Sequence, residues 1–227
     1  MPSFDLAKAP LRELNAALHA LSPTTNETHW VVSNPQGKHA VACGLDAPVT
    51  VEIDGHVGYY CAGMNKAATV VVSGNAGVGV AENMMSGEVR VKGDASQSAG
   101  ATGCGGLLVI EGNASARCGI SMKGIDIVVK GSIGPMSAFM AQAGNLVVLG
   151  DAGDALGDSI YEARLFVRGR VASLGADCIE KPMTEEDRAI LTAVLKRAGV
   201  DAVAGDFKLY GSARRLYHFH IDNVDAY

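Results

Sequence analysis

Residues 70–79 read VVVSGNAGVG, and the same pattern returns at 89–98 as VRVKGDASQS and at 108–117 as LVIEGNASAR. The glycine in each copy belongs to a series spaced 19 residues apart: Gly55, Gly74, Gly93, Gly112, Gly131, Gly150 and Gly169. A fixed period of this length is typical of a solenoid, in which each repeat forms one turn of a coil. The series predicts that most of the 227-residue chain is scaffold.

Two columns of the repeat are aliphatic in every copy. Four residues before the glycine the chain carries Val, Leu or Ile, as at Val89 and Leu108, and two residues before it Ile or Val, as at Val91 and Ile110. The residue directly before the glycine is mostly polar. This alternation with a period of two, rich in β-branched residues, predicts one half-buried strand in each repeat.

Two further columns describe the turn that follows. Asn or Asp comes directly after four of the glycines, and we interpret these residues as formers of left-handed turns. Seven residues after the glycine only Ala and Gly occur, as at Gly119 and Ala138. We therefore expect a tight inner corner, where a larger side chain would clash with a neighbouring coil.

These columns predict an all-β fold, a single-stranded right-handed parallel β-helix of about seven 19-residue coils with short capping helices at both ends. A βαβ unit needs roughly 30 residues, and helical repeats carry far fewer glycines. The hand follows the usual rule for parallel crossovers. We expect a capping segment at 1–48, the β-helix at 49–182 and a helix with an aromatic tail at 183–227.

Both ends of the β-helix have sequences suited to cover them. Leu11, Leu14, Leu18 and Leu21 share one helical stripe after a proline, and residues 27–50 resemble a degenerate first coil. After Pro182, Thr184 and Asp187 form a variant capping box for a helix that ends at Gly199. Residues 216–224 alternate weakly, as an edge or augmenting strand would.

Composition excludes several classes of protein. The net charge of −5 offers no basic stripe, so we expect no nucleic-acid partner. The chain has no apolar run of 18 residues and no signal peptide, which predicts a cytoplasmic protein without a membrane partner. The five cysteines form no CxxC pair, and we expect them to be buried, reduced and structural.

Three motifs invite a chemical interpretation, and we prefer a structural one for each. GNAGVG at 74–79 imitates a dinucleotide fingerprint, but another strand follows where a helix is needed. Residues 103–106, GCGG, could form an anion-binding nest, yet neighbouring repeats carry glycine at the same place. His218, His220 and Asp222 could hold zinc or iron, although no further ligand is evident nearby. We assign no catalytic, cofactor-binding or metal-binding residue to this chain.

The tail is the strongest candidate for a partner interface. Tyr217, His218, Phe219 and His220 lie outside the repeat and carry aromatic and imidazole side chains. Histidines alternating with aromatic residues are more often a polar strand face against a partner or solvent than a metal site. We therefore expect partner contacts at these four residues.

The stacked coils, including GDASQSAG at 93–100, GNASARCG at 112–119 and GDAGDALG at 150–157, resemble the GXGXG β-helix domain of the glutamate synthase large-subunit family. The resemblance covers residues 40–182. With SAGATGCGG at 98–106 and SLGADCIEKPMTEED at 173–187, the chain looks most like the small β-helix subunit of N-methylglutamate synthase. That resemblance implies a hetero-oligomer with a glutamine amidotransferase-like subunit and an FMN-binding, iron–sulfur barrel subunit.

The implied reaction is the exchange of the amino group of glutamate for methylamine, giving N-methylglutamate and ammonia. This sequence departs from the family's pattern in two ways that place the chemistry on the partners. It begins Met1-Pro2-Ser3 without an amino-terminal cysteine, and it lacks closely spaced cysteines for an iron–sulfur cluster. We therefore expect a structural subunit without activity of its own. Two alternatives remain, a scaffold in another glutamate synthase-like or formylmethanofuran dehydrogenase-like complex, and a stand-alone β-helix enzyme.

Overall fold

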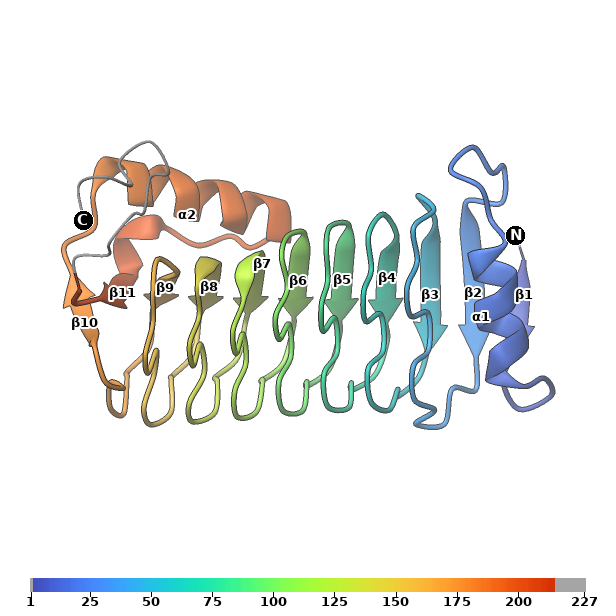
Figure 1. The fold of residues 1–227 in the computed structure, drawn as a ribbon, viewed down its shortest axis with the longest axis horizontal. Helices are drawn as coiled ribbons and strands as arrows, with labels where there is room; N and C mark the ends of the chain where they lie inside the picture. The colour runs from blue at the N-terminus through green and yellow to red at the C-terminus, as the bar shows by residue number, and fades with distance from the viewer. Residues whose placement is uncertain (1, 215–227) are drawn as a thin grey trace, which may run out of the picture.

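The computed structural model describes residues 2–214 of the chain. Strands β1 to β9 follow one another in chain order and pair in parallel, so that the chain winds into a parallel β-helix (Figure 1). The two helices lie near opposite ends of this stack. The predicted all-β fold with short helices at both ends is confirmed.

The strands are β1 (Ser3–Asp5), β2 (His29–Ser33), β3 (Thr50–Asp54), β4 (Thr69–Val72), β5 (Glu88–Val91), β6 (Leu107–Ile110), β7 (Lys123–Val129), β8 (Ala143–Val148), β9 (Arg164–Val167), β10 (Cys178–Lys181) and β11 (Lys208–Ser212). The helices are α1 (Leu11–His19), α2 (Glu185–Ala198) and a short 3₁₀ turn, η1 (Ala204–Asp206).

The 19-residue period sets the register between neighbouring coils. Val70 pairs with Val89, and Val89 pairs with Leu108. A second, shorter ladder joins the positions two residues after each glycine, for example Ala76 with Ala95. The two aliphatic columns before the glycine face one continuous core, in which Val89 and Leu108 are fully buried. The interior columns predicted from the sequence are therefore confirmed.

In the six coils from Gly55 to Gly150, the turn has a left-handed backbone at positions five, seven and nine after the glycine. In the coil of Gly112 these are Arg117, Gly119 and Ser121, with φ of 60°, 69° and 52°. The amide of position seven donates to the preceding coil, as Gly119 does to Ala99 at 2.8 Å, whereas position nine donates to the next, as Ser121 does to Phe139 at 2.8 Å. The left-handed residues thus point the amides of positions seven and nine at opposite neighbours. Position seven is also buried, as at Gly119 and Ala138, and this burial explains why only Ala and Gly occur there.

The interpretation of the Asn/Asp column as left-handed turn residues is wrong. Asn75, Asp94, Asn113 and Asp151 do not have a positive φ. The left-handed positions lie further along the turn and include non-glycine residues such as Arg117, because hydrogen bonds to both neighbouring coils hold the backbone there. Such bonding outweighs the cost of about 1–2 kcal/mol for a left-handed L-residue.

Helix α1 closes the amino-terminal end of the core. Leu14 and Leu18 are buried, as the helical stripe predicted. Asn15 completes two backbone hydrogen bonds of the first coil: its Nδ2 donates to Ala40 O at 2.8 Å, and its Oδ1 accepts from Ala42 N at 3.1 Å. The helix therefore supplies groups that a preceding coil would otherwise provide.

Helix α2 lies along the stack, over the outer face of β6 to β9 (Figure 1). It begins at the predicted capping box of Thr184 and Asp187 and ends at Gly199, which has φ of 70°. Its apolar residues form a second core with the outward-facing side chains of the four strands: Val109, Val128, Val147 and Phe166 pack with Leu191, Val194 and Leu195. These strands are accordingly apolar on both faces, a pattern typical of doubly covered strands.

Strand β11 inserts between β9 and β10 and pairs antiparallel with both. Its residues, Lys208–Ser212, include Tyr210 of the aromatic tail. The further strand that the weak alternation at 216–224 predicts lies outside the described residues. Within residues 2–214 neither helix is long and apolar enough to cross a bilayer.

Candidate functional site

Six of the seven repeat glycines, from Gly74 to Gly169, leave space for polar side chains of the preceding coil. A Cβ added to Gly74 would lie 2.7 Å from both Gly55 C and His56 Nδ1, and one added to Gly150 would lie 2.6 Å from Ser132 Oγ. At Gly93, Gly112 and Gly131 the contact would be with the side-chain oxygen of the residue that follows the preceding glycine. Close approach between coils, rather than a positive φ, therefore requires glycine at these six positions, whereas Gly55 has φ of 135°.

The side chains that fill this space form a ladder along the β-helix. Each accepts a hydrogen bond from the amide 19 residues further on: Asn75 Oδ1 from Asp94 N at 2.9 Å, Asp94 Oδ1 from Asn113 N at 2.7 Å, and Asn113 Oδ1 from Ser132 N at 2.9 Å. The ladder begins at His56 and ends at Arg170. Because these side chains bond the coils to one another, we assign the ladder a structural role.

The cysteines differ more in exposure than the sequence indicated. Cys61, Cys118 and Cys178 are buried as expected, and burial raises the pKa of the Cys118 thiol to about 12 and that of Cys178 to about 11. Cys43 is half-buried and Cys104 is exposed, which corrects the prediction of five buried thiols. Cys104 stands on the turn of its coil, eleven residues after the repeat glycine.

The three motifs weighed in the sequence fall in different places. GNAGVG at 74–79 is part of a coil, and β5 rather than a helix follows it. In the GCGG segment, Gly106 has φ of 86° and the corresponding Gly87 has φ of 80°, so the segment is the ordinary turn before a strand. Among residues 2–214, no three His, Cys, Asp or Glu side chains gather as metal ligands.

Tyr217, His218, Phe219 and His220, and with them Asp222, lie outside the described residues. Their assignment as a partner interface therefore stays a prediction. The described chain approaches them through Arg214, which forms an ion pair with Asp177 of the last coil. The amide of Ala213 also donates to Asp177 O at 2.7 Å, so the chain is anchored to the last coil up to this point.

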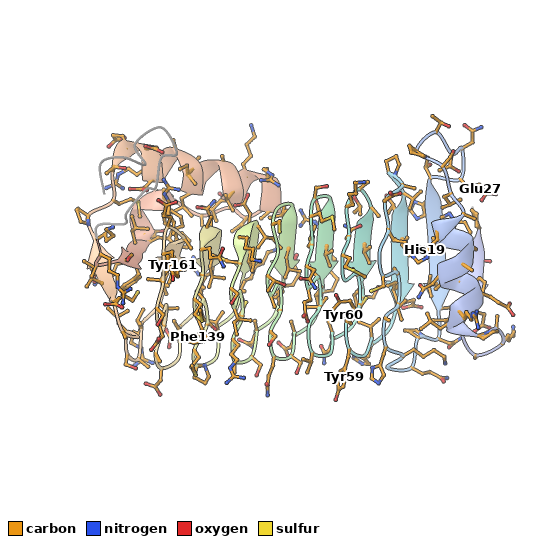
Figure 2. The ribbon with its side chains drawn as sticks, in the orientation of Figure 1. His19, Glu27, Tyr59, Tyr60, Phe139 and Tyr161 are labelled. Carbon is orange, nitrogen blue, oxygen red and sulfur yellow. The ribbon has the colours of Figure 1, made fainter. Side chains whose placement is uncertain are left out.

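A cavity of about 520 Å³ opens between the last coil, strands β10 and β11 and the start of α2. Its polar lining includes Arg164, Lys181, Asp187 and Ser212. Tyr161, labelled in Figure 2, stands at its margin and is 45% exposed. The cavity thus lies where the last coil, β10, β11 and α2 meet.

Asp187 is the centre of the hydrogen bonding at this junction. Its Oδ2 accepts from Thr184 N at 3.0 Å and from Thr184 Oγ1 at 2.7 Å, and its Oδ1 accepts from Arg164 Nε at 3.0 Å. Burial works to raise the pKa of Asp187, but the hydrogen bonds from Thr184 and Arg164 outweigh it and hold the pKa below its usual value. One carboxylate thus caps α2 and attaches it to β9.

The cations around the cavity have protein partners. Arg164 bonds Asp187, Lys181 Nζ donates to Ser212 O at 3.0 Å, and Arg214 pairs with Asp177. Chemically the junction is therefore suited to hold α2 and β11 in place, and we assign it no catalytic role. The capping box indicated Asp187 from sequence alone, whereas the contribution of Arg164, 23 residues earlier, had no sequence signal.

No family model matches the chain. Over 228 aligned residues, which cover all of both chains, it is 65% identical to a protein of Rhizobium meliloti (strain 1021) named Protein GlxC. At this identity over the full length, the two chains share one fold and one set of coils.

Proposed function

Because the chain belongs to the GlxC family, we propose that it is the structural subunit of a glutamate synthase-like enzyme, a flavin-dependent N-methylglutamate synthase. In this complex it would join an amidotransferase-like subunit to an FMN-binding barrel subunit that also carries an iron–sulfur cluster. The complex would convert methylamine and L-glutamate to N-methyl-L-glutamate and ammonia. The chain itself would contribute no reacting group.

The observation that carries this proposal is the parallel pairing of successive coils along the whole stack. Strands β2 to β9 all pair in parallel, with a register shift between Lys123 and Asp126 of β7, and the side-chain ladder repeats the same kind of bond from His56 to Arg170. Such a stack resists bending, because several hydrogen bonds join each coil to both of its neighbours. A rigid element is what a complex needs to keep two active sites at a fixed separation.

The coil sequences support the glutamate synthase-like assignment. The strand–Gly–Asn/Asp–Ala pattern, which resembles the GXGXG domain, corresponds in the structure to strand, close-approach glycine, ladder side chain and second-ladder bridge. Ser98, Gly100 and Thr102, at alternate positions of the turn, are left-handed, a conformation that glycine adopts without strain.

The proposal is tested by co-expression of this chain with an amidotransferase-like subunit and an FMN-barrel subunit from one operon. We expect a complex with fixed stoichiometry that forms N-methylglutamate from methylamine and glutamate. We expect no turnover from the chain alone. Failure of the wild-type chain to co-purify with either subunit, or turnover by the isolated chain, would contradict the proposal.

A further inference from the structure

Four exposed large apolar side chains lie in two neighbouring columns of the repeat, two near each end of the stack. The two columns are the positions nine and eleven residues after the glycine in six coils, and we call them together the Met ridge. Its residues are Met64, Lys66, Asn83, Met85, Thr102, Cys104, Ser121, Lys123, Met140, Gln142, Ser159 and Tyr161. Met64, Met85, Met140 and Tyr161 are 43%, 51%, 42% and 45% exposed. In the described chain they are half of the eight large apolar side chains that are exposed.

The backbone holds the Met ridge in a fixed shape. Position nine is left-handed, with φ of 55° at Met64 and 52° at Met140, and its amide bonds the next coil at 2.8 Å in both cases. The residue between the two columns is buried in every coil, for example Met84 and Met122. The ridge side chains therefore project from a rigid backbone, which lowers the entropy cost of binding.

The charge on the Met ridge is of one sign. None of its twelve positions is acidic, although the whole chain has a net charge of −5. Lys123 is exposed and forms no ion pair with any residue in 2–214. Lys66 pairs with Asp46 at 3.6 Å, but both side chains are about 60% exposed, so this pair is weak. The ridge thus offers two cations, about 14 Å apart at the spacing of strands.

Resting on the proposed function, we propose that the Met ridge is the docking surface for one catalytic subunit, whose contacting strip is apolar and flanked by carboxylates. Methionine and tyrosine are enriched at protein interfaces, and lysine and acidic residues are depleted there. Methionine also adapts to irregular partner surfaces. From Met64 to Tyr161 the ridge spans five coil spacings, about 24 Å. Figure 2 shows Tyr161 near its carboxyl-terminal end.

Cys104 provides a probe in the middle of the Met ridge. It is exposed, Cys43 is half-buried and the other three thiols are buried, so Cys43→Ser leaves Cys104 as the one readily accessible thiol of the described chain. A maleimide should label Cys104 in the isolated chain. In the co-purified complex we expect this labelling to be lost and to return when the complex is dissociated.

Substitutions test the same surface without a label. Met85→Glu and Met140→Glu introduce acids where the partner carries them, and each should weaken assembly by about tenfold or more. Val203→Glu is the matched control: Val203 is 68% exposed but lies after α2, off the ridge, and its variant should assemble normally. Unchanged circular dichroism and melting temperature would show that all three variants fold.

The outcomes separate the ridge from the proposed function. If the complex forms while Cys104 stays reactive, or if both glutamate variants assemble normally, the ridge is not the docking surface and the scaffold role stands. If the wild-type chain binds neither subunit, both proposals are wrong. Protection of Cys104 in the isolated chain would also overturn the inference. Light scattering would then show what covers it: a second copy if the isolated chain is a dimer, and another part of the same chain if it is a monomer.

Discussion

Gly112 illustrates why the repeat cannot tolerate a side chain at its most regular position. An added Cβ would approach Gly93 O at 2.9 Å and would collide with Asp94 Oδ1, which accepts the amide of Asn113. Gly112→Ala must therefore displace two coils or break this bond. We expect a loss of about 1–3 kcal/mol in the free energy of unfolding, measured by urea denaturation.

Gly205→Ala is the control for this substitution. The nearest atom to a Cβ at Gly205 is Val203 Cγ1 at 4.0 Å. The free energy of unfolding of this variant should therefore lie within about 0.5 kcal/mol of the wild-type value. Equal stability of the two variants would show that close approach does not account for the period.

The inner corner makes a second prediction at the residue scale. Ala138 is fully buried with φ of 56°, so a larger side chain has neither space nor a relaxed backbone there. Ala138→Leu should cost about 1–3 kcal/mol or more by overpacking. A normal melting temperature for this variant would mean that position seven does not face the core.

Residue columns were predictable from sequence as far as they depend on burial. The aliphatic columns and the Ala/Gly column depend on burial, and their residues face the interior as the 19-residue spacing predicts. The role of Asn75 and its equivalents was not predictable from turn preference, because their bonds run to an amide 19 residues away. Propensity describes local backbone, whereas this ladder is a contact between coils.

Helix α1 acts as a substitute for a missing coil, and Asn15 tests this at the scale of elements. Asn15→Ala leaves Ala40 O and Ala42 N without their partners. We expect a loss of about 1–3 kcal/mol, with faster hydrogen exchange in the first coil. Arg12→Ala, on the exposed side of the same helix, should have little effect; equal losses in both variants would contradict the capping role.

Helix α2 should show a dependence on pH through Asp187. The pKa of Asp187 is lowered in the folded state, so its contribution to stability is present above the unfolded pKa of about 3.9 and is lost as pH falls through the folded pKa. Asp187→Asn should therefore flatten the acid limb of the stability curve, measured by thermal unfolding between about pH 2 and 6. An unchanged acid limb would mean that Asp187 does not stabilise the helix.

The places of α2 and β11 were harder to predict than their existence. The capping box located α2, but only the apolar outer faces of strands such as Leu107–Ile110 indicated what it covers. Strand β11 returns antiparallel into the stack and belongs to no column of the repeat. Its pairing depends on tertiary contacts with β9 and β10, for which the period carries no information.

At the scale of the molecule, the β-helix is a rod with different surfaces on different sides. The ladder occupies one edge, α2 covers part of the sheet, and the Met ridge lies along the turns. The chemistry proposed for the complex belongs to its partners, so this chain should determine assembly and not the identity of the amine. Variants that unfold the rod should therefore abolish activity of the complex by loss of assembly.

Reconstitution tests the central claim most directly. The amidotransferase-like and FMN-barrel subunits are purified separately, and formation of N-methylglutamate from methylamine and glutamate is measured with and without this chain. The account predicts that the two catalytic subunits assemble and turn over at the full rate only when this chain is added, and that the chain alone is inactive. Full activity and assembly of the two subunits in its absence would contradict the account.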